Sequence, residues 1–292
     1  MRHAYLIIAH DRPQELARLL RALDYVENDI YVHLDRKSKC FDLDVLKENV
    51  KSSGLFFVPR ISVTWGGESQ IKAELLLFSE AFSHGGYRYY HLLSGVDYPV
   101  KSQTYIHRYF DKCDGENFIA LKDINDVSPR FRMRFEQCHF LHEPFVGKKR
   151  NFWKYVDFAL CYAQRAIGIC RFRGRPMKRH SNWISVTDDV ISLIVENRDR
   201  ILKEYRWTYC CDEVFVLSEI WNTSLRATLS PKGNLRYMEW VHVSGRDWSP
   251  RPITMEDIDI LSQPDILFAR KFTSPQSDSL CKYLDQNVLP RN

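Results

Sequence analysis

Two adjacent cations near the C-terminus are the residues whose chemistry is easiest to define. Arg270 and Lys271 stand between apolar neighbours in the run Phe268-Ala269-Arg270-Lys271-Phe272, after a predicted helix over residues 254–261. Because apolar flanks would hold both side chains in place, the arginine fork and the compact lysine charge would suit a phosphate group. An edge strand with solvated charges has the same pattern, so the run alone leaves both interpretations open.

A second group of polar residues follows two apolar runs at the N-terminus. The pattern predicts strands over residues 4–9 and 29–34, joined by an amphipathic helix over residues 14–23. This order is typical of a parallel α/β sheet with a right-handed crossover, whose ligands bind at the carboxyl ends of the strands. One crevice should therefore contain His10, Asp11, Arg12, His33, Asp35 and Lys37. Carboxylates for ribose and base donors, and cations for a diphosphate, would suit a nucleotide sugar.

Further candidates lie where apolar runs give way to turn residues. Asp97 lies in the predicted turn over residues 94–99, where it would face a ligand or stabilise the turn itself. Glycines at Gly66 and Gly67 would let the backbone approach a ligand, and Trp65 would give a flat wall for a sugar. A turn with a core tryptophan would have the same sequence. Trp183 and Trp248 are two other candidate sugar platforms.

Ordered blocks over nearly the whole chain resemble the Core-2/I-branching β-1,6-N-acetylglucosaminyltransferase and peptide xylosyltransferase family, glycosyltransferase family 14. The blocks are Tyr5-Leu6-Ile7-Ile8-Ala9-His10, Ile30-Tyr31-Val32-His33-Leu34-Asp35-Arg36-Lys37-Ser38, Thr64-Trp65-Gly66-Gly67-Glu68-Ser69, residues 90–102, Ser181-Asn182-Trp183-Ile184-Ser185-Val186, Asp212-Glu213-Val214-Phe215 and Phe268 to Phe272. Each block is weak alone, but their order is hard to produce by chance.

The resemblance implies an α/β GT-A fold and an inverting transfer from a UDP-sugar, with no metal ion or other cofactor. It assigns the donor diphosphate to Arg270 and Lys271, places Asp97 at the donor site, and gives the general base role to Glu213, with Asp97 as second choice. It favours UDP-GlcNAc as donor, with UDP-xylose as the alternative. From the residues alone, Glu213 could equally be a first-turn acid of a helix capped by Asp212.

Two Asp-x-Asp strings could hold a metal ion in principle. They are Asp42-Leu43-Asp44 and Asp257-Ile258-Asp259, and both are predicted to lie in the first turns of helices, where carboxylates favour the helix dipole. The eight cysteines have no zinc-like spacing, and we expect them to be reduced.

The composition fits a single catalytic domain over residues 1–292. With 45% hydrophobic residues the chain can bury a large core. We expect a nucleotide-binding half (1–120), a loop-rich basic insertion (121–180) and an acceptor and catalytic half (181–292). Residues 246–252 read as a loop by their proline content, with Arg251 or Arg246 as an extra cation for the diphosphate.

The basic insertion decides where in the cell we expect the protein to act. Residues 152–169 are aromatic-rich with helical spacing and have basic flanks, so residues 146–179 would lie on an anionic membrane or pack as a helix with solvated flanks. With neither a signal peptide nor a membrane anchor in the sequence, we expect a bacterial, cytoplasmic enzyme, peripheral at the inner face of the membrane. Its glycan acceptor, in surface polysaccharide assembly, would then be lipid-linked.

Three other classes of function have some support in the sequence. A sugar-binding or scaffold protein could keep the fold without turnover, although Glu213, Arg270 and Lys271 argue against it. A dinucleotide-dependent oxidoreductase would need Gly-x-Gly-x-x-Gly after the first strand, which is absent. The sequence pI near 8.7 allows nucleic-acid binding, but no recognised motif supports it.

Overall fold

The computed structural model describes residues 1–292 except 114, 123–127, 149–150, 243–247 and 290–292. Its main sheet has the strand order β3-β2-β1-β4-β6, formed by β1 (His3–Ala9), β2 (Asn28–Leu34), β3 (Gly54–Phe57), β4 (Tyr89–Ser94) and β6 (Ser185–Thr187). β1 to β4 are parallel, and β6 joins β4 antiparallel. The predicted α/β architecture, a Rossmann-like mixed sheet flanked by helices, is confirmed.

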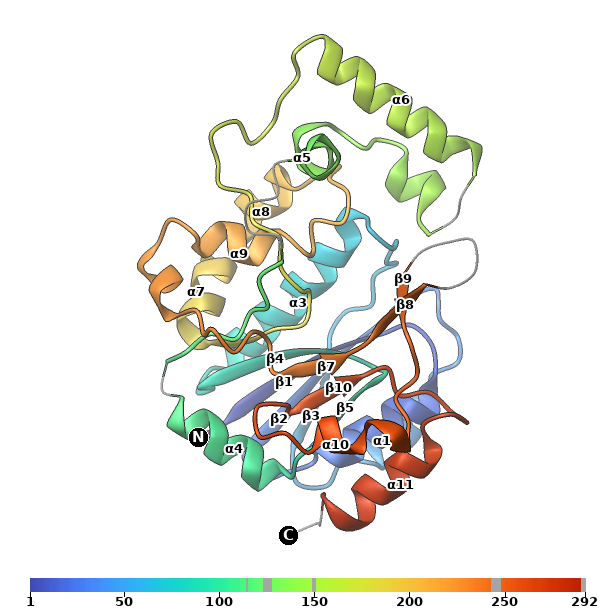
Figure 1. The fold of residues 1–292 in the computed structure, drawn as a ribbon, viewed down its shortest axis with the longest axis vertical. Coiled ribbons are helices and arrows are strands. Elements are labelled where there is room, and N and C mark those ends of the chain that lie inside the picture. The colour runs from blue at the N-terminus through green and yellow to red at the C-terminus, as the bar shows by residue number, and fades with distance from the viewer. Residues whose placement is uncertain (114, 123–127, 149–150, 243–247, 290–292) are drawn as a thin grey trace.

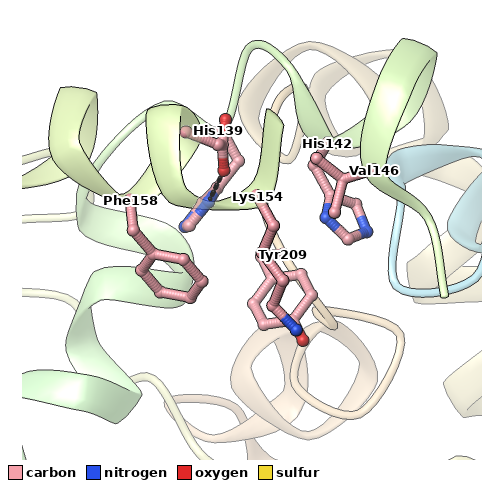
Figure 2. Close-up of a pocket in the computed structure, with 7 residues that line it drawn as sticks. His139, His142, Val146, Lys154, Phe158 and Tyr209 are labelled. Carbon is pink, nitrogen blue, oxygen red and sulfur yellow. Dashed lines mark hydrogen bonds and ion pairs between the residues drawn. The ribbon is translucent and has the colours of Figure 1, made fainter. Parts of the chain in front are cut away.

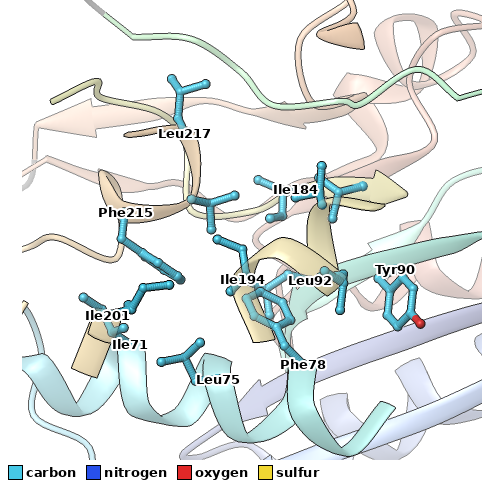
Figure 3. Packing of buried hydrophobic residues seen from close by; sticks show 14 of the residues in the cluster. Ile71, Leu75, Phe78, Tyr90, Leu92, Ile184, Ile194, Ile201, Phe215 and Leu217 are labelled. Atoms are coloured by element: carbon cyan, nitrogen blue, oxygen red, sulfur yellow. The ribbon is translucent and has the colours of Figure 1, made fainter. Parts of the chain in front are cut away.

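Helices cover both faces of this sheet (Figure 1). One face packs against α3 (Glu68–His84), α7 (Asp188–Glu196), α8 (Arg198–Glu204) and α9 (Phe215–Ile220), and the other against α1 (Pro13–Leu23), α4 (Gln103–Lys112) and α11 (Asp278–Asn287). Alternation along β1 builds both cores, since Ala4 and Leu6 join the first and Tyr5 and Ile7 the second. Figure 3 shows the first core, where Leu75 and Phe78 of α3 meet Ile194 of α7.

A small second sheet carries the basic pair. Its order is β5-β10-β7, formed by β5 (Asp97–Pro99), β10 (Phe268–Arg270) and β7 (Arg236–Met238). The edge-strand interpretation of residues 268–272 is therefore wrong, because β10 is hydrogen-bonded on both sides. The predicted turn over residues 94–99 is also shorter than expected, since its second half is strand β5. This pairing places Arg270 directly opposite Asp97.

The basic insertion is helical rather than loop-rich. It contains α5 (Pro129–Glu136), the helical turn η1 (His142–Val146) and α6 (Phe152–Ala166), which lie at the end of the molecule remote from both termini (Figure 1). Asn151 caps α6 by accepting a hydrogen bond from the Lys154 N–H at 3.2 Å. No helix in the described part of the chain is both long and apolar enough to cross a membrane.

Both Asp-x-Asp strings have the predicted helix-start positions. Asp42 accepts hydrogen bonds from the backbone N–H groups of Asp44 and Val45 at the start of α2 (Leu43–Lys47). Asp257 forms a capping box with Thr254 at η3 (Met255–Asp257), which leads into α10 (Ile258–Leu261). Their carboxylates therefore serve local backbone structure.

The predicted proline-rich loop over residues 246–252 is partly a strand. Residues Trp248–Pro250 form β9, which pairs with β8 (Trp240–His242) in an antiparallel hairpin. A proline at the end of a short edge strand is compatible with this pairing. Arg246 lies outside the described residues. The remaining turn, η2 (Ser224–Thr228), follows α9.

Candidate active site

The carboxyl ends of three parallel strands meet at one edge of the sheet. The Asp35 N–H after β2 donates to the carbonyl of Ala9 (2.9 Å), and the Gly95 N–H after β4 donates to the carbonyl of Ile8 (3.0 Å). The Phe272 N–H after β10 donates to the carbonyl of Val96 at 2.9 Å. These bonds bring the chain after β1, β2, β4 and β10 together, as the sequence predicts for a ligand site.

Arg270 is held by Ser94 at the end of β4 and Asp97 at the start of β5. Its guanidinium donates to a carboxylate oxygen of Asp97 at 3.0 Å and to the hydroxyl of Ser94. Asp97 is buried and also accepts the N–H (2.9 Å) and the hydroxyl (2.8 Å) of Ser94. The Trp183 ring lies 4.5 Å from the guanidinium carbon, at cation–π distance. Asp97 therefore positions Arg270, and its engaged carboxylate is poorly placed to act as a base.

Lys271 lies in a cluster of positive charge. Burial lowers the pKa of its ammonium group, and the charges of Arg12 and Arg270, with a smaller effect of Lys148, lower the pKa further. Asp11 opposes this shift, but within the described residues Lys271 forms no ion pair. Half-buried cations that outnumber their counter-charges favour an anionic ligand. Sequence reasoning named Arg12 but missed Lys148, which comes from the insertion.

Arg12 adds backbone strain at the same place. It is the residue before α1 and has φ of 58°, in the left-handed region that non-glycine residues seldom adopt. Its guanidinium lies 3.3 Å from a carboxylate oxygen of Glu15, and the Ser274 N–H donates to the same oxygen at 3.1 Å. The start of α1 is thus tied to the segment that follows Lys271.

Glu213, the predicted base, lies two residues before α9 and is partly exposed. Its carboxylate oxygen Oε2 lies 3.7 Å from Nη1 of Arg134 and 3.6 Å from Nε of Arg179. Both arginines come from the insertion, and no motif in the sequence points to either. The distances exceed those of tight hydrogen bonds, so the carboxylate keeps oxygen lone pairs for another donor.

Two buried carboxyl groups lie behind Glu213. Asp212 accepts a hydrogen bond from the side-chain amide of Gln70 at 3.1 Å, and burial, then the charge of Glu213, raise its pKa to about 7. Burial raises the pKa of Glu74 well above its usual range, and the nearby Asp212 adds to this shift. The predicted capping role of Asp212 is wrong, because α9 has no side-chain cap. In the sequence, the one sign of this buried pair was an acidic residue, Glu74, within the apolar face of the predicted helix.

A short extended segment joins the base to the basic pair. The His180 N–H donates to the carbonyl of Glu213 at 2.8 Å, and Trp183, three residues on, packs against Arg270. Three residues of chain span at most about 11 Å. Residues 180–183 therefore link the backbone of Glu213 to the guanidinium of Arg270.

The comparisons with known proteins agree with this geometry. Residues 3–266 match the family model described as Core-2/I-branching enzyme. The chain belongs to this family. Membership, together with the mixed sheet flanked by helices, supports the GT-A fold that the sequence predicts.

Known relatives of this Core-2/I-branching family member include xylosyltransferases. One from Ciona intestinalis is 23% identical over 305 residues, and xylosyltransferase 2 from Rattus norvegicus is 24% identical over 306 residues. Both alignments cover 98% of the chain but 34% and 33% of those proteins, so the chain spans about a third of the length of these curated relatives. The mouse xyloside xylosyltransferase 1 structure, apo form, has a TM-score of 0.41 at 9% identity, covering 92% of this chain and 97% of that one.

The loop over Trp65, Gly66 and Gly67 borders the base rather than the basic pair. The Cys210 N–H donates to the carbonyl of Gly66 at 2.8 Å, and Trp65 is exposed. Gly66 has φ of 71°, and a Cβ there would lie 2.9 Å from Sγ of Cys210. A Cβ on Gly67 would likewise meet the Glu143 carboxylate. Both glycines therefore allow other parts of the protein, rather than a ligand, to approach the backbone closely.

Four predicted ligand residues are placed less favourably in this family member. The buried carboxylate of Asp35 accepts the N–H groups of Lys37 (2.9 Å) and Val63 (3.4 Å), which fixes the loop after β2. Arg251 is bound to Asp257 and Glu239, so the structure does not offer it as a free cation. Trp248 is exposed on β9. His10 is also exposed, directly after β1, and its ring lies 3.6 Å from the Asp11 carboxylate.

A separate polar pocket lies under α6 (Figure 2). Its lining residues are His139, His142, Val146, Lys154, Asp157, Phe158 and Tyr209. Three residues here, His139, Asp157 and Cys161, have ligand atoms within 4.8 Å of one another. Both ring nitrogens of His139 already have protein partners, Asp157 at 2.7 Å and the carbonyl of Met133 at 3.0 Å. The group therefore forms a buried structural network.

Proposed function

We propose that the protein is an inverting glycosyltransferase that transfers a sugar from a UDP-sugar to a hydroxyl of a glycan acceptor. The observation that carries the proposal is the cluster of half-buried Lys271, Arg270 and Arg12, with exposed Lys148 nearby, at the carboxyl ends of the parallel strands. A diphosphate is the ligand whose charge this cluster best complements.

The basic pair would stabilise the departing nucleotide. As the glycosidic bond breaks, negative charge grows on the UDP leaving group, and cations fixed beforehand stabilise that charge without reorganising. Asp97, Ser94 and Trp183 hold Arg270 in one orientation. We propose that the transfer needs no metal ion, because fixed cations fill the electrostatic role and both Asp-x-Asp strings start helices.

Glu213 would act as the general base. Its carboxylate would remove the proton from the acceptor hydroxyl as that oxygen attacks the anomeric carbon from the face opposite UDP. Arg134 and Arg179 would then orient the carboxylate at distances of 3.7 and 3.6 Å.

Two donors are proposed. The sequence blocks favour UDP-GlcNAc and a β-1,6 linkage, whereas the relatives named xylosyltransferase favour UDP-xylose. For the acceptor we propose a glycan of a bacterial surface polysaccharide. Incubation with each radiolabelled donor and a panel of glycan acceptors separates the two, because only the true donor is consumed in the presence of acceptor.

The decisive test is UDP binding by calorimetry. Binding should survive EDTA, and Arg270→Ala with Lys271→Ala should weaken it roughly a hundredfold or more, since two charge-assisted contacts are lost. The control pair Arg21→Ala and Lys282→Ala removes the same charges at exposed positions and should leave affinity unchanged. Loss of binding in EDTA would show that a metal ion holds the nucleotide. UDP binding without transfer to any acceptor would favour the sugar-binding or scaffold alternative.

A further inference from the structure

Helix α6 is packed with its polar face inward. Asp157, Cys161 and Gln164 recur at helical spacing and are its buried side chains. An amphipathic helix on a globular core normally buries its apolar face. The sequence predicts helical spacing over residues 152–169, and the structure confirms a helix over Phe152–Ala166 but turns its polar side toward the rest of the protein.

Specific hydrogen bonds fix this orientation. Asp157 pairs with the His139 ring at 2.7 Å and accepts the Leu141 N–H at 3.0 Å. Gln164 bonds both backbone groups of Cys138, accepting its N–H at 2.8 Å and donating to its carbonyl at 2.9 Å. Buried polar groups without partners are costly, so rotating α6 to bury its apolar side would break all four bonds.

The outward side of α6 is aromatic and aliphatic. The exposed fractions are 71% for Phe152, 70% for Tyr155, 60% for Tyr162 and 77% for Ile167, and we call these four residues the α6 outer face. Next to it, Phe145 of η1 is also exposed and stacks on the Trp153 ring at 5.0 Å. Side chains of this size grouped on one helix mark a contact surface rather than scattered surface residues.

The segment that carries this face is strongly basic, although Arg175 and Arg179 pair with carboxylates of other elements. Residues 144–179 include ten lysines and arginines and a single carboxylate, Asp157, which is buried against His139. Lys148, Arg165 and Arg173 are exposed in the described part of this segment. A second copy of the same face would bring like charges together, which disfavours a symmetric dimer through it.

We propose that the α6 outer face inserts into the headgroup region of an anionic lipid bilayer, with the surrounding lysines and arginines contacting lipid phosphates. Aromatic side chains prefer the boundary between headgroups and acyl chains, and basic residues near it are attracted to anionic lipid. The molecule is already folded for this contact, because α6 presents these side chains without rearrangement.

The same unit adjoins the candidate active site. The Glu143 carbonyl in η1 lies 3.3 Å from the Thr64 hydroxyl, and its carboxylate lies 3.4 Å from the Ser69 N–H. Lys148, between η1 and α6, is near enough to influence Lys271. Bilayer contact would therefore bring the candidate active site toward the membrane surface, where an acceptor carrying a lipid anchor would reside.

The test is co-sedimentation of the full chain with vesicles of phosphatidylcholine, with and without phosphatidylglycerol. The parent should pellet with the anionic vesicles only. Phe152→Ser with Tyr155→Ser and Ile167→Ser should lower the partition coefficient about tenfold or more, and so should Arg165→Glu with Arg173→Glu. All these positions are exposed, so folding should persist, which circular dichroism checks.

Matched controls carry the same changes at the opposite end of the molecule. Val26→Ser with Val45→Ser alters exposed apolar residues, and Arg21→Glu with Lys282→Glu reverses exposed charges. Both should bind vesicles like the parent. Equal binding by the α6 variants and the controls, or no binding by the parent, would overturn the proposal. A parent dimer that the α6 variants dissociate, without vesicle binding, would identify a contact between copies instead.

Tryptophan fluorescence can show which surface of the protein contacts the lipid. Brominated lipid should quench the fluorescence of Trp153, and Trp153→Phe should remove most of this quenching. Quenching that persists in the variant would mean that another surface contacts the lipid. Neither measurement depends on the donor or on catalysis, so this proposal can fail while the proposed function stands, and the reverse.

Discussion

The two ends of the parallel sheet use polar residues in opposite ways. Near the amino ends, His3, His91 and His107 are buried and hydrogen-bond mainly to neutral groups. His91 contacts His3 at 3.1 Å and the Ser185 hydroxyl at 2.8 Å, and His107 bonds Asn28 at 2.7 Å. At the carboxyl ends, Lys271 has cationic neighbours and, among the described residues, no ion pair.

This difference indicates that the buried histidines stabilise the fold, whereas Lys271 serves to bind a ligand. The histidine rings pack against one another and Phe110, and four of their six ring nitrogens have hydrogen-bond partners within the fold. Lys271 destabilises the protein that carries it, because half-buried like charges repel. Such a group is expected where a ligand of opposite charge completes the site.

The largest expected effect is on turnover. Glu213→Gln keeps the size and the backbone bond to His180 but removes the basic oxygen, so transfer should fall about 10²- to 10⁴-fold while UDP affinity stays within twofold. Glu204→Gln is the matched control, since Glu204 also lies between two arginines, at 2.6 and 2.7 Å. Steady-state transfer and calorimetry give the two quantities. If Glu213→Gln and Glu204→Gln behave alike, Glu213 is not the base.

A middle-sized effect should follow Asp97→Asn. The amide would turn an N–H group toward Arg270 or toward the Ser94 N–H, so Arg270 loses its fixed orientation. We expect roughly tenfold weaker UDP binding and a loss of about 3 kcal/mol in the free energy of unfolding. Asp265→Asn breaks the exposed pair with Lys232 and should cost less than about 1 kcal/mol. Equal effects of both changes on denaturant unfolding and on UDP titration would remove Asp97 from its positioning role.

The smallest expected effect is on how the free energy of unfolding depends on pH, through the histidines near the amino ends of the strands. Burial lowers the pKa of His3 and His91 well below their ordinary value. Below about pH 6.5 the unfolded chain therefore takes up protons that the folded state refuses, and the free energy of unfolding falls with falling pH.

A single substitution measures this contribution. His91→Gln should lower stability at pH 7.5 but make the loss between pH 7 and 5 shallower, by up to one proton's slope. His84→Gln, at an exposed position, should leave the slope of the parent. Denaturant titrations at several pH values decide the question. An unchanged slope in His91→Gln would show that His91 does not contribute to acid destabilisation.

Much of the fold could be predicted because its signals are local. The first strand, helix and second strand were placed within a residue of β1, α1 and β2, since each is a regular pattern bounded by polar or proline residues. The short strands β5 and β9 were missed. Three residues carry no readable period, and their pairing partners are far away in sequence.

For the candidate site too, local signals could be predicted from the sequence and long-range contacts could not. Residue types suggested phosphate binding by Arg270 and Lys271, but nothing local could show that Asp97 holds Arg270, because that pair is formed across two strands. Arg134, Arg179 and Lys148 approach from the insertion, whose fold the sequence did not reveal. The orientation of α6 was also beyond periodicity, since a helical pattern defines two faces without saying which one has a partner.

The inverted packing of α6 has a consequence for how fast the protein could reach a membrane. Many surface-seeking segments gain helical structure only on contact with lipid and lose conformational entropy in that step. Here the buried network around Asp157 has already ordered the helix. Adsorption would then be a rigid-body encounter, governed by the long-range attraction between positive protein and negative lipid, with helix content unchanged before and after.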